Sequence, residues 1–142
     1  MSNVANIADS IVAELNAGSF SQSFTAERHY RPLFDLADMK TLRVSVVPRG
    51  QIVNPGSRTR NAFDYSVDVA VQKKLDAGDN AEFDPLLSLV EEVADHFRLK
   101  RLASFPEAIW IRTANEPIYA TEHLDELRQF TSVLTLTYRV HR

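Results

Sequence analysis

The chain has 142 residues, of which 44% are hydrophobic and 25% charged, so residues 1–142 are enough for a single domain with its own core. It contains no cysteine, which excludes disulfides, thiolate metal ligands and cysteine catalysis. A net charge of -3 argues against a general nucleic-acid binder, and no apolar run approaches the roughly 20 residues of a membrane span.

The first elements in chain order are a helix and a strand. Apolar residues recur at helical spacing from Val4 to Leu15, which predicts an amphipathic helix over roughly Asn3 to Asn16. Side chains alternate from Ser23 to Tyr30, as in a first strand. Residues 31–39 are apolar but interrupted by proline and aspartate, so we expect a packed loop there, with at most one helical turn.

Two further strands, Leu42 to Val47 and Ala62 to Gln72, are separated by a segment rich in turn-forming residues. Pro48 is expected to stop the first of these strands, and Asn54-Pro55-Gly56 is a strong turn signal. The sequence therefore predicts a hairpin in which residues 48–61 form a long projecting loop.

The second half of the chain predicts one clear helix and two strands. A broad apolar stripe from Phe83 to Phe97 indicates a helix that begins near Ala81. Ala108 to Arg112 is expected to be a short strand, and Thr121 to Arg128 has the length of a helical turn or two. Strict alternation from Phe130 to Arg142 predicts a long final strand.

This order, α-β-β-β-α-β-(α)-β, predicts an α+β fold. We expect a mostly antiparallel sheet of about four to five strands, with two main helices packed on it. Because the long strands each have one apolar face, the sheet should be covered on one side. If the final strand lies at a sheet edge, its unpaired backbone groups would invite another chain.

The sequence offers little for catalysis. No two of the four histidines have i, i+4 metal spacing on a helix, and no phosphate-binding glycine loop or nucleophile motif is present. Asp64 and Asp68 share a strand face, as metal-binding carboxylates of nucleases do, but such a face is expected to be polar anyway. We therefore expect no catalytic residue, cofactor or metal, and a small metal-dependent hydrolase remains an alternative.

The predicted loop is the best candidate for an interface. It carries three arginines in an acidic chain, and arginine is well suited to contacts with an acidic neighbour, although many loops are simply polar and mobile. Ile118 and Tyr119, which follow the turn at Asn115-Glu-Pro117, belong either to the core or to a subunit contact. The candidate interface residues are Arg49, Ile52, Val53, Arg58, Arg60, Ile118 and Tyr119.

Five segments carry a resemblance to a known family. They are Leu15-Asn-Ala-Gly-Ser-Phe20, Val69-Ala-Val-Gln-Lys-Lys74, Leu89-Val-Glu-Glu-Val-Ala94, Asn115-Glu-Pro-Ile-Tyr119 and Phe130-Thr-Ser-Val-Leu-Thr-Leu-Thr-Tyr138. With them the chain resembles the tail terminator, or tail completion, proteins of long-tailed bacteriophages and prophages. The resemblance runs over nearly the whole chain, and the family has no shared active-site motif.

The resemblance implies a structural virion protein and not an enzyme. Such a protein forms a ring, commonly a hexamer, that caps the tail tube, stops its polymerisation and provides a docking surface for the head-neck. The implied partners are copies of itself, the tail tube protein and the head-neck connector proteins, with DNA passing through the ring without sequence-specific binding. The implied location is the tail-neck region of the virion, and the host cytoplasm during assembly, with no membrane. Another neck component, a head-closure or tail-adaptor protein, is the alternative.

Overall fold

The computed structural model of the chain describes residues 2–30, 41–76, 79–122, 124 and 128–142. Two helices and five strands lie in these residues, and their order confirms the predicted α+β class. The elements are α1 (Asn3–Ala17), β1 (Ala26–Arg28), β2 (Arg43–Pro55), β3 (Asn61–Lys74), α2 (Asn80–Phe97), β4 (Ile109–Ala114) and β5 (Gln129–His141).

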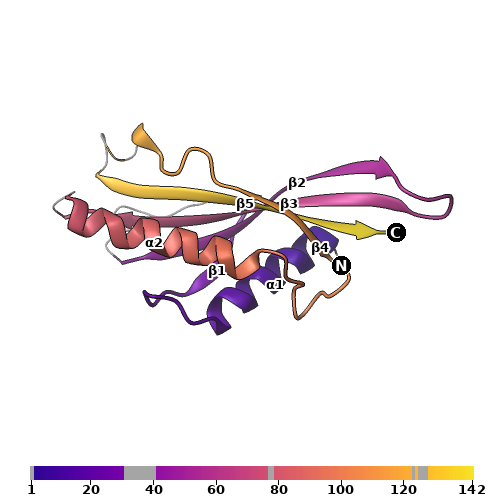
Figure 1. Cartoon of the computed structure of the whole chain (residues 1–142), viewed down its shortest axis with the longest axis horizontal. Coiled ribbons are helices and arrows are strands. Elements are labelled where there is room, and N and C mark those ends of the chain that lie inside the picture. Colours follow the sequence, from indigo (N-terminus) through magenta and orange to yellow (C-terminus); the bar gives the residue numbers. More distant parts are fainter. Residues whose placement is uncertain (1, 31–40, 77–78, 123, 125–127) are drawn as a thin grey trace.

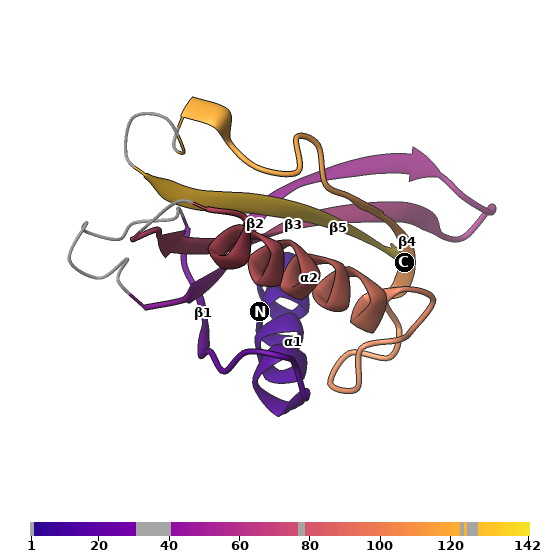
Figure 2. The ribbon, with the colours of Figure 1, turned by 60° about the vertical axis from the view of Figure 1, so that its left-hand side comes forward.

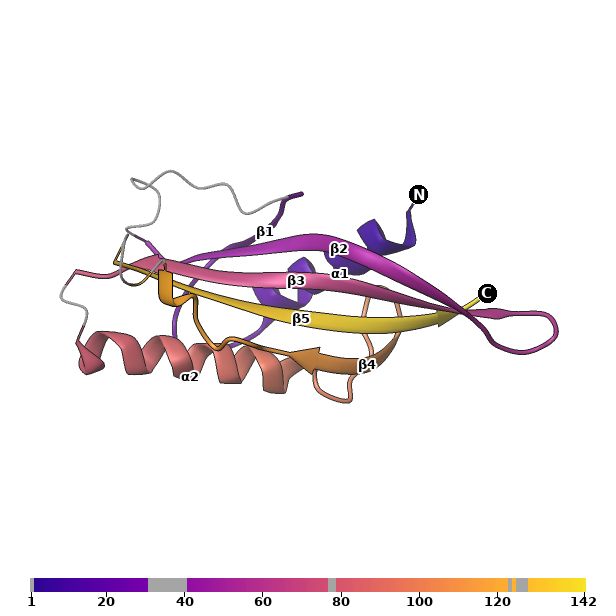
Figure 3. The same ribbon diagram turned by 90° about the horizontal axis from the view of Figure 1, so that it is seen from above.

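The five strands form one sheet in the order β1-β2-β3-β5-β4 (Figure 3). β1 runs parallel to β2, whereas all the other neighbours are antiparallel. The final strand, β5, is therefore an interior strand between β3 and β4. It does not lie at a sheet edge, so it cannot recruit another chain in the way that an edge strand would.

The two helices cover the same face of the sheet (Figures 1 and 2). The strand residues beneath them are apolar and almost fully buried, as the alternation predicted. They are Val44, Val46, Val67, Val69, Val71, Leu134, Leu136 and Tyr138. Ile7 and Ile11 of α1 and Leu89 and Val93 of α2 close the core from the other side.

Both helices begin at a side-chain cap. The hydroxyl of Ser2 accepts a hydrogen bond from the Ala5 N–H at 3.4 Å, and the carboxylate of Asp79 accepts one from the Glu82 N–H at 3.0 Å. Gly18 ends α1, where its N–H donates to the carbonyl of Glu14. Neither helix has the length and apolar character needed to span a bilayer.

The prediction that Pro48 stops its strand is wrong. β2 continues through Pro48 to Pro55, and its register against β3 shifts between Pro48 and Gly50. Proline is tolerated there because it lies at a bulge and because the pairing of β1 with β2 ends at Val46, so no ladder bond is lost. Most of the segment predicted as a loop, residues 48–61, is consequently strand, because residues 48–55 belong to β2 and Asn61 begins β3.

The other boundaries differ by less. β1 spans Ala26–Arg28, which is shorter than the predicted strand of Ser23 to Tyr30. The expected loop over residues 31–39 lies outside the described residues, as does much of the expected helical turn over residues 121–128.

The central pair of strands should dominate stability. We expect Leu136→Ala, at a site with no solvent exposure, to lower the free energy of unfolding by about 2–5 kcal/mol in urea denaturation, because the substitution leaves a cavity. The control is Ile52→Ala, at a site that is 60% exposed, where a change of no more than about 0.5 kcal/mol is expected. Equal losses in the two variants would contradict this account of the core.

Candidate interaction surface

The most prominent surface feature is the distal end of β2 with the turn that leads into β3, residues 48–61, which we call the arm (Figure 1). Its strand residues pair with β3 from Gly50↔Ser66 to Pro55↔Asn61, and every residue from Arg49 to Asn61 is exposed. Gly56 is required at its turn, because a Cβ atom there would lie 2.7 Å from the carbonyl oxygen of Arg60. The arm is thus an ordered projection from the body.

The end of the chain runs beside the arm as far as its turn. Asn61 and Arg142 exchange two backbone hydrogen bonds, of 2.7 and 3.0 Å. The guanidinium of Arg142 also stacks over the ring of Phe63, 4.1 Å from its centroid. Only the turn, residues 56–60, extends beyond these contacts.

The structure separates the three predicted arginines into two groups. Arg49 is the extra residue of the bulge, and its Nη1 donates to Thr135 Oγ1 at 3.0 Å and lies 3.4 Å from Asp68 Oδ1. Arg58 and Arg60 are at the tip, where neither has a hydrogen-bond or carboxylate partner among the described residues. Only these two are free to meet another molecule without breaking an internal contact.

The apolar candidates also differ from one another. Ile52 is 60% exposed and Val53 is 49% exposed, and as successive strand residues they lie on opposite faces of the arm. Tyr119 packs edge-on against Phe83, with ring centroids 4.9 Å apart, and so contributes to the core. Its neighbour Ile118 is 55% exposed.

The face of the sheet opposite the helices carries a polar network. Asp64, which is only 5% exposed, accepts two hydrogen bonds from Arg139, at 2.7 and 3.0 Å. Asp68 accepts a 2.7 Å hydrogen bond from Thr135, and Ser66 lies 3.3 Å from Thr137 across the same pair of strands. Both aspartates already accept hydrogen bonds from neighbouring side chains. The described residues also contain no group of three potential metal ligands.

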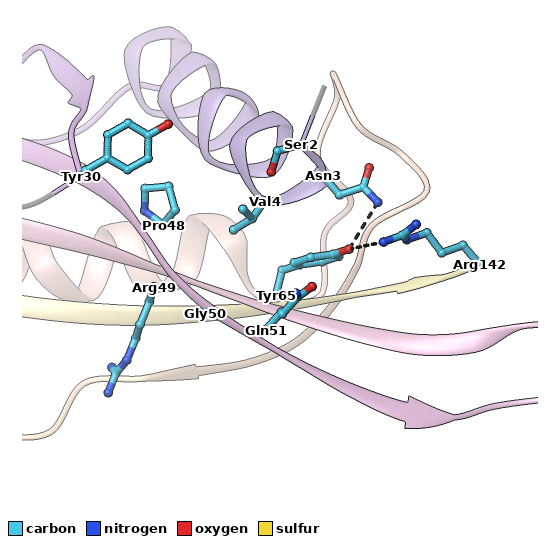
Figure 4. Close-up of a pocket in the computed structure, with 10 residues that line it drawn as sticks. All are labelled: Ser2, Asn3, Val4, Tyr30, Pro48, Arg49, Gly50, Gln51, Tyr65 and Arg142. Carbon is cyan, nitrogen blue, oxygen red and sulfur yellow. Dashed lines mark hydrogen bonds between the residues drawn. The ribbon is translucent and has the colours of Figure 1, made fainter.

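The cavity between the N-terminus of α1 and the base of the arm is about 630 Å³ (Figure 4). On one side of it the hydroxyl of Tyr65 accepts 3.4 Å hydrogen bonds from Asn3 and Arg142. Its lining contains two arginines but no carboxylate, histidine or cysteine.

A second cavity, missed by sequence reasoning, lies between α2 and β4 and is about 340 Å³. It is lined by residues of α2, β4 and β5, including Val90, Ala94, Trp110 and Leu134. These residues lie together only because of the strand order, which could not be predicted from the sequence. The only available signal was the acidity of the predicted helix.

Comparison with protein-family models gave no match, and comparison with curated protein sequences gave none either. Among solved structures, the chain is similar to a chain in a structure described as the virion of a native gene transfer agent (GTA) particle. The match has a TM-score of 0.60 and 14% sequence identity, and it covers 100% of both chains. At this identity, the likeness shows a shared fold.

The Asp64–Arg139 pair should make stability depend on pH. Hydrogen bonds from Arg139 lower the pKa of Asp64, against the opposing effect of burial. A carboxyl whose pKa is lower in the folded state stabilises the protein above its unfolded pKa of about 4, and this stabilisation is lost as the pH falls. Wild type should therefore exceed Asp64→Asn in unfolding free energy at pH 7, with the difference shrinking as the pH falls below about 4.

Urea denaturation at several pH values measures this difference. Arg139→Gln is the matched variant, because it removes the cause of the pKa shift and leaves the carboxyl in place. It should show the same loss of pH-dependent stability. A constant difference between wild type and Asp64→Asn from pH 7 to 3 would contradict the assignment.

Proposed function

We propose that this chain is a structural protein of a phage-like virion that forms a ring of six copies on the end of the tail tube. The observation that carries the proposal is the likeness of fold over the full length of both chains to the chain from the gene transfer agent virion. The sequence resemblance to tail terminators points to the same class. The ring would stop tube polymerisation and offer a docking surface to the head-neck.

The surface supports a role in contacts. The arm is ordered, exposed and basic at its tip, and it has exposed aliphatic side chains on both faces. Asp64 and Asp68, the two carboxylates of the hydrolase alternative, already accept hydrogen bonds from Arg139 and Thr135. The described residues contain no group of three His, Asp or Glu side chains that could hold a metal ion.

Capping by such a ring needs no chemistry. A ring subunit has to match the last tube subunit on one side and lack the surface that recruits a further layer on the other. Many modest contacts made together give high avidity, so a ring binds a tube end far more tightly than one subunit does. DNA passing through the ring would require a lumen that does not bind it in a sequence-specific way.

Electron microscopy of particles made without the gene tests this proposal. We expect overlong or unfinished tails, because nothing would end tube growth. A plasmid copy of the wild-type gene should restore tails of normal length. Normal tails on leaking heads would instead assign the chain to head closure, the alternative neck function.

Calorimetry tests the hydrolase alternative directly. Titration of the purified chain with Mg²⁺ or Mn²⁺ should give no binding heat beyond dilution, since Arg139 and Thr135 already bond to the two aspartates. A binding isotherm that Asp64→Asn abolishes would contradict the structural role and favour metal-dependent chemistry.

A further inference from the structure

The cavity between α2 and β4, which we call the groove, has an apolar floor. Val90 is 3% exposed and Leu134 is 1% exposed, and the half-buried side chains of Ala94 and Trp110 complete the floor. The Trp110 ring is held in place by its Nε1, which donates to Thr113 Oγ1 at 3.0 Å. A dry apolar cavity of about 150 Å³ can take up a benzene molecule. The groove, at about 340 Å³, therefore has room for aliphatic side chains.

The rim of the groove is mainly acidic. Glu91 and Asp95, one helical turn apart on α2, both line it and are exposed, and Arg98 lies at the end of the helix. Neither carboxylate has a partner among the described residues. The helix as a whole is acidic, since it contains five carboxylates and no lysine or arginine. These carboxylates are Glu82, Asp84, Glu91, Glu92 and Asp95.

The arm has the complementary chemistry. Residues 48–61 contain three arginines and no carboxylate, and Arg58 and Arg60 at the tip are unpaired within the described part of the chain. Because Ile52 and Val53 lie on opposite faces of the arm, either face would present an aliphatic side chain to an apolar floor. Arginine beside such a side chain is a typical composition for the centre of an interface.

The arm and the groove cannot meet within one molecule. The arm is built on β2, whereas the groove is at β4, and β3 and β5 lie between these strands in the sheet. Two complementary surfaces at opposite edges of a molecule fit a head-to-tail contact between copies, which generates a closed ring or an open filament.

We propose that the arm of one copy docks in the α2–β4 groove of the next copy. Ile52 or Val53 covers the apolar floor, and Arg58 and Arg60 pair with Glu91 and Asp95. This contact deepens the proposed function, and it rests on that function for its biological setting only, since the surfaces are properties of the chain itself. The occupant is a second copy because the same chain supplies both the cations and the carboxylates.

Charge-reversal substitutions on the arm and on the groove test the contact. Sedimentation velocity over a range of concentrations should show that the wild-type chain self-associates, and that this association weakens in high salt. Arg58→Glu with Arg60→Glu should raise the dissociation constant at least about tenfold, because like charges then face each other. Glu91→Arg with Asp95→Arg should do the same. The variant with all four changes should recover most of the lost affinity, since the charges are complementary again.

A matched control changes the same charge elsewhere. Lys73→Glu with Lys74→Glu lies at the other end of β3 from the arm and should leave association unchanged. The four positions changed in the arm and the groove are exposed, whereas Lys73 and Lys74 are half-buried, and thermal melts of each variant establish that the fold is retained.

Three results would overturn the arm–groove contact. They are a wild-type chain that stays monomeric at every concentration, a fourfold variant no better than the double variants, and control changes that are as harmful as those in the arm. The tail-length experiment is independent of all three. If arm variants associate normally but leave tails unfinished, the arm belongs to a contact with the tube protein and the capping function stands.

Discussion

The fold depends on the uninterrupted pairing of β3 with β5. Thirteen residue pairs run from Ala62↔His141 to Lys74↔Gln129 through the middle of the sheet. In this register the apolar residues of both strands lie on one face, so a shift of one strand by a single residue would move its apolar set to the polar face. Both helices pack on the face that this register creates, and every other strand is added outside this pair.

The sequence predicted the elements with a local signal and missed those set by distant partners. Alternation located β3 and β5 well because one face of each is buried. It could not show that β5 is interior, because strand order depends on pairing across the chain. The passage of β2 through Pro48 was missed for the same reason, since proline is tolerated only at a bulge or beside an unpaired edge. The Asp64–Arg139 pair could not be predicted, because only the β3–β5 register places these two residues opposite each other.

The candidate surface divides in the same way. Turn-forming residues and arginines marked the arm, and the structure places Arg58 and Arg60 at its tip. Nothing in the sequence distinguished Arg49 from them, because only the bulge directs it onto Asp68 and Thr135. The groove could not be predicted from the sequence, because Trp110 and Leu134 are distant in sequence and belong to different strands. Its acidic rim alone is an ordinary solvated helix face.

A head-to-tail contact gives a ring only if the rotation between successive copies adds up to a full turn, and the structure restricts that rotation. The arm is part of a continuous sheet, and Asn61, next to its turn, is bonded to Arg142 at the end of β5, so its direction relative to the body is restricted. A restricted arm fixes the rotation between successive copies, whereas a flexible loop would permit both rings and filaments. Closure then satisfies every arm and every groove, while an open filament leaves one of each exposed at its ends. Under the proposed capping function this difference matters, because a closed ring has no free end to extend.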